Sequence, residues 1–269
     1  MSAQTRSEIS RLLDAHGLRP NHRLGQHFLA DGNVTRKIVS VAAVGQGDKV
    51  VEVGAGTGTL TSGLAATGAK VISYEVDERL RPILEAVTAG VDVDLRFEDM
   101  TDVDLGDALE GDGWTMVANL PYNVGTPLIM EAMRKAPNVE RFVVMVQREV
   151  AERFVASPGT SEYGLPSVVV QIHADAELAF RVPPQVFYPP PRVESAVVVM
   201  ARKPTPELSE PAIALARAGF GQRRKMLRGS LGSVLRDPAG SLEKAGIDPT
   251  ARAEELSPDD YLRLAGVDS

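Results

Sequence analysis

The segment VEVGAGTG, residues 51–58, constrains the fold more than any other part of the sequence. Apolar residues lead into glycines at positions 54, 56 and 58, and a helix-like run, TLTSGLAATG, follows. This pattern predicts a buried strand, a tight turn and a helix, with the strand's carboxyl end open to close approach by a ligand. A dinucleotide fingerprint needs glycine where this sequence has Thr59, so the turn alone also fits a connection that binds nothing.

Strand-like and helix-like segments alternate through residues 48–156. The alternation predicts an α/β fold of Rossmann-like type, with a doubly wound and mostly parallel sheet. Residues 165–182 and 194–203 look like strands with no helix between them, so we expect them to add antiparallel edge strands. The composition changes at the proline-containing segment 202–211, which predicts a linker. We therefore expect a first domain over residues 1–203, including an N-terminal extension, and a small all-helical domain over residues 204–269.

Composition excludes several classes of protein. Cysteine is absent, and the four histidines lack the spacing of metal ligands, so we expect neither disulfides nor a metal site. The sequence contains no apolar stretch of membrane-spanning length, and its N-terminus carries Glu8 and Asp14 without an apolar signal core, so we expect a cytoplasmic monomer without membrane contact.

The charge is unevenly distributed. The net charge of −7 argues against indiscriminate coating of nucleic acid, but residues 217–236 contain six basic residues and no acid. Four of these cations lie on a predicted helix, in which Arg224 and Arg228 would share a face: Arg223, Arg224, Lys225 and Arg228. A solvated helix face is the usual meaning of such a run, and contact with RNA phosphates is the functional alternative.

Two acids follow the next two predicted strands. Glu75 ends VISYE, 21 residues after Gly54, where a carboxylate can accept hydrogen bonds from both ribose hydroxyls. Asp99 ends DVDLRFED, where it can accept from an adenine amine. The alternative for Glu75 is capping of the following helix, which Asp77 could do equally well. Together with the glycine turn, the acids predict a nucleoside site.

The segment NLPY, residues 119–122, ends another buried strand. The side-chain carbonyl of Asn119 and the backbone carbonyl of Leu120 can accept both hydrogens of an adenine amine, which makes that nitrogen more nucleophilic. Pro121 restricts Leu120 to an extended conformation, and Tyr122 offers a ring for the base to stack on. The structural alternative is a proline turn with Asn119 as a cap. The nucleoside site nearby favours methyl transfer from S-adenosylmethionine.

These motifs resemble those of known adenine methyltransferases. VEVGAGTGTLT, YEVD, EDM and NLPY are similar to adenine-specific N-methyltransferases. RLGQHFL, VPPQVFYPPPRVESAVV, GFGQRRKMLRGSL and GIDPTARAEELSPDDYLRLA extend the likeness to ribosomal RNA adenine dimethyltransferases of the KsgA type, from Arg23 to Leu264. The resemblance implies transfer of methyl groups to two adjacent adenines near the 3′ end of small-subunit ribosomal RNA, in an immature subunit.

The resemblance also implies site residues. It implies that His27 and Leu29 line the cofactor, that Gly54 approaches its methionine part, and that Glu75 binds the ribose, Asp99 the adenine and Asn119 the reacting region. Gly56, in the same turn as Gly54, is a further cofactor-binding candidate. Many members have proline after the first glycine, whereas this chain has alanine, and members vary between Asn and His at position 27.

A second aromatic position comes from VFYPPP. The resemblance favours Phe187 as the ring that sandwiches the flipped adenine opposite Tyr122, with Tyr188 as the competing choice and core packing as the alternative for either ring.

Other functions remain open at this level. The same chemistry could act on large-subunit RNA, as in macrolide-resistance methylases, or the protein could serve ribosome assembly mainly by binding. A nicotinamide oxidoreductase is disfavoured, because Thr59 interrupts the fingerprint and no catalytic acid or base is evident.

Overall fold

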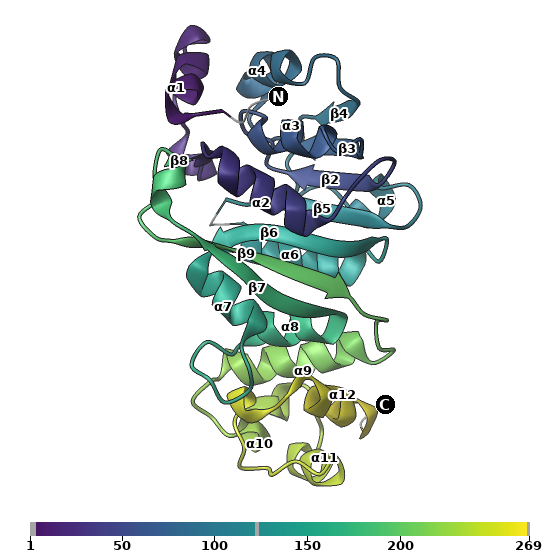
Figure 1. Cartoon of the computed structure of the whole chain (residues 1–269). Helices are drawn as coiled ribbons and strands as arrows, with labels where there is room; N and C mark the ends of the chain where they lie inside the picture. Colours follow the sequence, from purple (N-terminus) through teal and green to yellow (C-terminus); the bar gives the residue numbers. More distant parts are fainter. Residues whose placement is uncertain (1–3, 122–123, 268–269) are drawn as a thin grey trace. The chain divides into compact units, whose positions relative to one another are not determined.

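The computed structural model of the chain describes residues 4–121 and 124–267, and Figure 1 labels its helices and strands. The chain divides into two compact units. The first comprises Met1–Ala151 and Glu177–Ala201, and the second comprises Glu152–Ala176 and Arg202–Ser269. Within the described residues, no helix has both the length and the apolar character that crossing a bilayer requires.

A seven-stranded sheet in the order β4-β3-β2-β5-β6-β9-β7 forms the centre of the first unit. The five strands from β4 to β6 run parallel, and β9 is antiparallel to β6. The mostly parallel α/β fold predicted from the sequence is thus confirmed. The strands are β2 (Lys49–Val53), β3 (Lys70–Tyr74), β4 (Val93–Arg96), β5 (Trp114–Asn119), β6 (Val139–Gln147), β7 (Ala174–Val182) and β9 (Ser195–Arg202).

Helices α2 and α3 cover one face of the sheet with a continuous apolar core. Ile38 of α2 and Leu64 of α3 pack in one cluster with Val50 and Val117 of the two central strands. Such parallel strands are buried on both faces, which explains their largely apolar sequences. The helices of this part of the chain are α2 (Gly32–Ala42), α3 (Thr59–Ala65), η2 (Glu78–Leu80), α4 (Arg81–Val87), α5 (Leu105–Ala108), α6 (Gly125–Lys135) and α7 (Arg148–Val155).

The N-terminal segment forms a second small layer beside the sheet. Helix α1 (Arg6–Ala15) begins with a capping box between Thr5 and Glu8, and its Ile9 and Leu13 pack with Phe28 in an apolar cluster. The short strand β1 (Phe28–Leu29) pairs antiparallel with β8 (Phe187–Tyr188). This pairing brings the segments GQHFL and FYPPP, which are far apart in the sequence, side by side.

Residues 165–173 form a helix, α8 (Leu165–His173), so the prediction of a strand there was wrong. The run Val168–Val170 is fully buried, and an apolar run of this kind does not distinguish a buried helix from a buried strand. Pro166 in the first turn and a hydrogen bond from the Gly164 N–H to Ser167 Oγ (3.1 Å) start the helix. Strand β7 begins only at Ala174.

The second unit is helical and larger than the predicted domain 204–269, because it includes residues 152–176. Tyr163 accounts for part of this. Its hydroxyl donates to the Leu256 carbonyl (2.9 Å), and its ring contacts Phe220, which also contacts Tyr261. The boundary at Ala201 lies two residues from the predicted one. The helices of the unit include α8, α9 (Ser209–Gly221), α10 (Leu227–Ser230), α11 (Pro238–Lys244) and α12 (Pro258–Val267).

Glu52 introduces a titratable group into the core of the first unit. Its side chain on β2 is fully buried, and its Oε2 accepts hydrogen bonds from Thr61 Oγ1 (2.6 Å) and Ser73 Oγ (2.5 Å). Its Oε1 has no hydrogen-bond partner among the described residues. Burial raises the pKa of this carboxyl from 4.5 to about 7, because the charged form is poorly solvated there.

We predict that the stability of the protein falls as pH rises from 4.5 to 7. In that interval the folded state holds a proton on Glu52 that the unfolded state releases, so the free energy of unfolding decreases by on the order of 3 kcal/mol in total. Urea unfolding between pH 5 and 8 should show this decrease in the wild type and a shallower one in Glu52→Gln. Identical pH profiles for the two proteins would contradict the assignment.

Candidate active site

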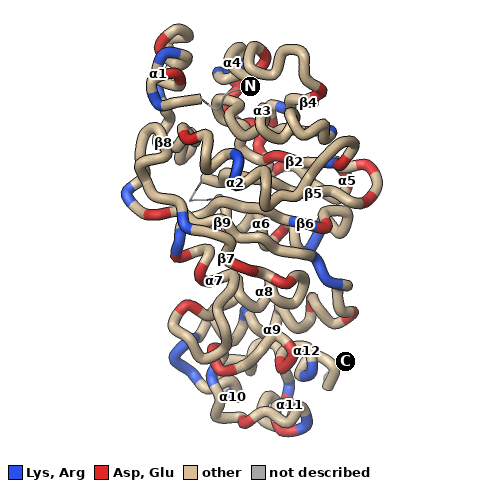
Figure 2. Tube along the Cα trace, viewed as in Figure 1, with Lys and Arg blue, Asp and Glu red and all other residues tan. Residues whose placement is uncertain are grey.

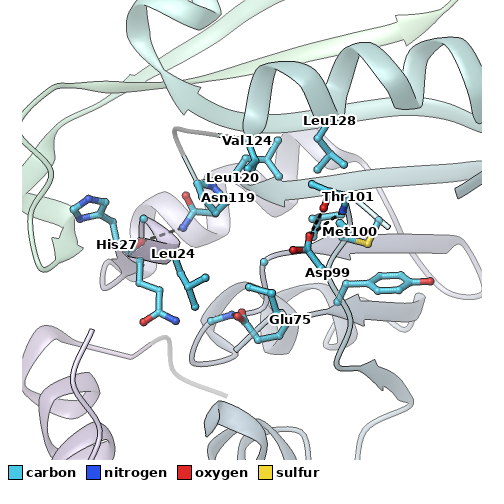
Figure 3. A pocket seen from close by; sticks show the side chains of 18 of the residues that line it. Leu24, His27, Glu75, Asp99, Met100, Thr101, Asn119, Leu120, Val124 and Leu128 are labelled. Atoms are coloured by element: carbon cyan, nitrogen blue, oxygen red, sulfur yellow. Dashed lines mark hydrogen bonds between the residues drawn. The ribbon is translucent and has the colours of Figure 1, made fainter. Parts of the chain in front are cut away.

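A pocket of about 820 Å³ lies at the carboxyl ends of the central strands. Figure 3 shows its lining side chains, which come from several loops of the first unit. This volume includes solvent space at the open mouth of the pocket. The lining segments are Leu24–Phe28, Val53–Gly54 with Gly56, Tyr74–Val76, Glu98–Thr101 and Asn119–Pro121, joined by Val124 and Leu128.

The glycine turn forms one wall of the pocket. Gly54 has a φ of +85°, and a Cβ built on it would lie 3.1 Å from the Asn119 carbonyl oxygen. The N–H groups of Gly54 and Ala55 both donate to the Tyr74 carbonyl (2.9 and 3.1 Å). Only glycine fits this backbone conformation and this close approach, so the wall consists of bare main chain.

Glu75 lies against this turn, as the sequence predicted. The residue is only 6% exposed, and its carboxylate accepts hydrogen bonds from the N–H groups of Gly56 (2.7 Å) and Asp77 (2.9 Å). Burial raises the pKa of Glu75, while the two backbone donors lower it. Asp77, whose Oδ1 accepts from the Arg79 N–H (3.3 Å), caps η2, so capping does not occupy Glu75.

Asp99 lines the opposite part of the pocket and is solvent exposed. Its Oδ1 accepts hydrogen bonds from the backbone N–H (2.9 Å) and the hydroxyl (2.8 Å) of Thr101. These bonds fix the carboxylate in a turn. Figure 3 shows Asp99, Glu75 and Asn119 around one space.

Asn119, the last residue of β5, has a fixed side-chain orientation. Its Nδ2 donates to the His27 carbonyl (3.2 Å), so its Oδ1 points away from that carbonyl (Figure 3). The N–H of Leu120 donates to Met145 of β6 (3.2 Å), and the Pro121 carbonyl accepts from Gly125 (3.0 Å). The segment therefore presents an amide oxygen held by neighbouring strands and loops. Tyr122 lies outside the described residues.

His27 lies in the lining, but Leu29 does not. The Nδ1 of His27 is 2.7 Å from the Pro189 carbonyl, which requires a proton on that nitrogen. Leu29 is 4% exposed and belongs to the apolar core, where it pairs with Phe187. His27 precedes β1 and lines the pocket, whereas Leu29 at the end of β1 faces the core.

Neither candidate ring for stacking on a base lines the pocket. Phe187 is 1% exposed within the apolar core, and the Tyr188 hydroxyl lies 3.3 Å from that of Ser10 on α1. Both rings are engaged in packing in this conformation, as the structural alternative anticipated. Stacking by Phe187 stays a prediction, and it requires a conformation that uncovers the ring.

The four predicted cations do not lie along one helix, because Arg223, Arg224 and Lys225 lie in a turn and Arg228 lies on the short helix α10 (Leu227–Ser230). Figure 2 shows Lys and Arg gathered beside α10, which begins only at Leu227. The prediction of one helix carrying all four cations was wrong, because the Leu227 N–H bonds to the Ala251 carbonyl (2.8 Å) and the Leu227 side chain is fully buried. Arg223 Nη2 donates to the carbonyls of Ser161 (3.2 Å) and Tyr163 (3.1 Å). The other three cations of the segment are exposed: Arg224, Lys225 and Arg228.

Several lining residues were not predicted. Val76 is 42% exposed directly after Glu75, and Met100 directly follows Asp99, so each acid is paired with an apolar neighbour that suits a base. Their positions next to Glu75 and Asp99 are the sequence feature from which they could have been predicted. Gln26 also lines the pocket, and its contact with Asp77 could not be read from the sequence. The described residues contain no group of three potential metal ligands.

The fold is that of a Rossmann-like methyltransferase, and residues at the ends of its parallel strands, Asn119 among them, line one pocket. Residues 17–267 match the family described as ribosomal RNA adenine dimethylase. The chain belongs to this family.

Similar proteins agree with this assignment. The chain is 44% identical to a Ribosomal RNA small subunit methyltransferase A of Phenylobacterium zucineum, over 98% of this chain and 94% of that one. It is 40% identical to the protein of that name from Kineococcus radiotolerans, over 96% and 89%. Among solved structures, a dimethyladenosine transferase from Plasmodium falciparum matches with a TM-score of 0.76 at 25% identity, over 88% and 96%. The 23S rRNA methyltransferase ErmE shares the fold, with a TM-score of 0.69 at 24% identity, over 90% and 99%.

We predict that Gly54→Ala destabilises the protein more than Gly113→Ala does. Both glycines have similar φ values, +85° and +82°, but a Cβ at Gly113 would meet nothing within 4 Å. The shared conformational cost is roughly 1–2 kcal/mol, and the approach to Asn119 should add to it only at position 54. Chemical denaturation measures the difference, and equal losses would exclude the close approach.

Proposed function

We propose that this chain transfers methyl groups from S-adenosylmethionine to the exocyclic amines of two adjacent adenines near the 3′ end of small-subunit ribosomal RNA. We further propose an immature small subunit as the substrate. The observation that carries the proposal is the fixed amide of Asn119 in a pocket shared with Glu75 and Asp99.

The residues of the pocket fit this cofactor. Glu75 can accept from the two ribose hydroxyls with the lone pairs that its backbone donors leave, and Asp99 can accept from the adenine amine. Val76 and Met100 supply apolar contact for the adenine faces, and the bare backbone at Gly54 admits the methionine part. The cofactor supplies an electrophilic methyl group.

The chain's own contribution to the reaction is to prepare the amine. The lone pair of an adenine amine is delocalised into the ring. Two acceptors, Asn119 Oδ1 and the Leu120 carbonyl, would draw both amine hydrogens out of the ring plane and concentrate the lone pair on nitrogen. No strong base is needed, because the amine nitrogen becomes acidic once it carries the methyl group and can release its proton to water. Orientation of this kind contributes by placing the reacting atoms in line.

The choice of small-subunit RNA rests on the relatives. Those that are 38–44% identical over nearly the whole chain carry the name Ribosomal RNA small subunit methyltransferase A. The likeness to ErmE, a 23S rRNA methyltransferase, lies at 24% identity and supports only the fold. An assembly factor that works mainly by binding would not need Glu75, Asp99 and Asn119 together in one pocket, so the geometry favours catalysis.

We predict that Asn119→Ala abolishes methyl transfer while S-adenosylmethionine still binds. The substitution removes the amine acceptor but leaves Glu75 and Asp99 in place. Incorporation of labelled methyl groups into undermethylated small subunits measures the first effect, and calorimetry measures the second. Full activity in this variant would exclude the mechanism. Naked large-subunit RNA, assayed in parallel with the wild type, tests the alternative target.

A separate prediction concerns RNA binding. Arg224 is exposed in the basic turn, and Lys244 is exposed at the end of α11 in the same unit. If Arg224 contacts one phosphate, Arg224→Ala should lower the slope of log K against log salt by about 1, and Lys244→Ala should leave it unchanged. Filter binding to small subunits over a salt series gives both slopes. Equal slopes in the two variants would place the RNA elsewhere.

A further inference from the structure

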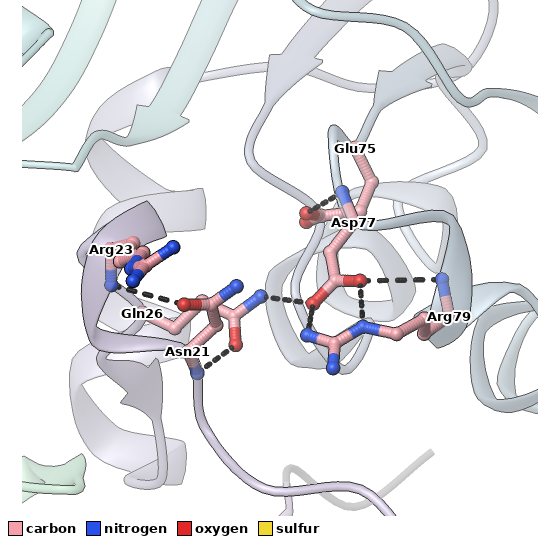
Figure 4. A network of polar contacts seen from close by, with 6 residues as sticks. All are labelled: Asn21, Arg23, Gln26, Glu75, Asp77 and Arg79. Carbon is pink, nitrogen blue, oxygen red and sulfur yellow. Dashed lines mark hydrogen bonds and ion pairs between the residues drawn. The ribbon is translucent and has the colours of Figure 1, made fainter.

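A chain of hydrogen bonds joins the loop 21–27, through Asp77, to Glu75 in the lining of the pocket. Figure 4 shows the side chain of Gln26 between the backbone of Asn21 and the carboxylate of Asp77. Gln26 Oε1 accepts from the Asn21 N–H (2.7 Å), and Gln26 Nε2 donates to Asp77 Oδ2 (2.8 Å). Both ends of the amide are therefore engaged, and its orientation is fixed.

Asp77 is the centre of this chain. It is only 6% exposed, and Arg79 donates to it twice from the guanidinium, through Nε to Oδ1 (2.7 Å) and through Nη2 to Oδ2 (2.7 Å). Asp77 also donates its backbone N–H to Glu75 Oε1 (2.9 Å). A charge-assisted bond of this type is stronger than a neutral one, so Gln26 is attached to a carboxylate that Arg79 holds in place.

The loop held by Gln26 reaches the other end of the pocket. Leu24, Gly25 and Gln26 line the pocket, and the next residue, His27, accepts from Asn119 Nδ2 through its carbonyl (3.2 Å). The loop 21–27 thus contacts Asp77 through Gln26 and the Asn119 amide through His27. Asp77 is in turn hydrogen-bonded to Glu75, the acid proposed to bind the ribose.

We propose that Gln26 and Asp77 are positioning residues for methyl transfer, whose hydrogen bond fixes the loop Asn21–His27 and thereby aligns Glu75 with Asn119. Gln26 and Asp77 touch no reacting atom in this role. The inference rests on the proposed function for the identity of the cofactor. Its consequence is that cofactor affinity and amide orientation depend on one contact between residues 51 positions apart.

The variant Gln26→Glu tests the contact with little change in shape. It keeps the acceptor for Asn21 but replaces the donor to Asp77 with an oxygen, so that two carboxylates face each other. We expect the dissociation constant and the KM for S-adenosylmethionine to rise about tenfold or more, with a smaller change in kcat at saturating cofactor. We also expect faster amide hydrogen exchange in residues 21–27 of the ligand-free protein.

The double variant Gln26→Glu/Asp77→Asn should recover much of this loss. The amide introduced at position 77 can donate to the new carboxylate, which restores the bond in the opposite direction and keeps an oxygen for Arg79 Nε. Arg79 Nη2 loses its acceptor, so the recovery should be incomplete. If each substitution only disturbed the local structure, the two losses of affinity would add in the double variant, and the second substitution would not restore binding. The matched control is Glu78→Gln, which removes an exposed carboxylate paired with Arg81 in the same turn and should change neither affinity nor exchange.

The possible outcomes separate this inference from the proposed function. Wild-type affinity and exchange in Gln26→Glu, or a double variant at least as impaired as the single one, would overturn the positioning role. If Gln26→Glu fails to fold, Gln26→Met removes both bonds without adding charge and gives the same comparison. If the wild type does not bind S-adenosylmethionine, the proposed function fails, whereas hydrogen exchange still decides whether the contact orders the loop.

Discussion

The register of the parallel strands is the constraint on which the site depends. Val53 of β2 pairs with Tyr74 of β3 and with Ala118 of β5. β2 and β3 end at this level, and β5 ends one residue later. The residues directly after this level are Gly54, Glu75 and Asn119. A slip of one residue in any pairing would turn that strand's side chains to the opposite face and withdraw its last residue from the pocket. The apolar core between the sheet and α2 and α3 makes such a slip costly.

This constraint explains why much of the site could be predicted from the sequence. Gly54, Glu75 and Asn119 each directly follow a mostly apolar run, and parallel strands separated by helices must place those ends along one edge. Only the order of the strands had to be assumed. The predicted residues that line the pocket are His27, Gly54, Gly56, Glu75, Asp99, Asn119, Leu120 and Pro121.

The features that escaped prediction depend on contacts between distant segments. The run Val168–Val170 is equally apolar in a helix and in a strand, and its partners in the second unit decide in favour of the helix. The ring of Phe187 is covered because β8 pairs with β1, 158 residues earlier by the register of Phe187 with Leu29. Gln26 and Asp77 carry no local signal of their contact. Sequence patterns show the periodicity of each segment and the residues at its ends. They do not show which distant segments pair with each other.

The orientation of the Asn119 amide links the N-terminal loop to the choice of substrate. A carboxamide can present either its oxygen or its nitrogen to a ligand, and the His27 carbonyl removes this ambiguity because it attracts the nitrogen and repels the oxygen. The group that faces the pocket is then an acceptor. An acceptor beside the Leu120 carbonyl suits a base with an exocyclic amine and opposes one with a carbonyl at that position, since two facing acceptors would both lose their partners. If Asn119 binds the target amine as proposed, selectivity for that amine depends on the loop that contains His27 as much as on the segment NLP itself.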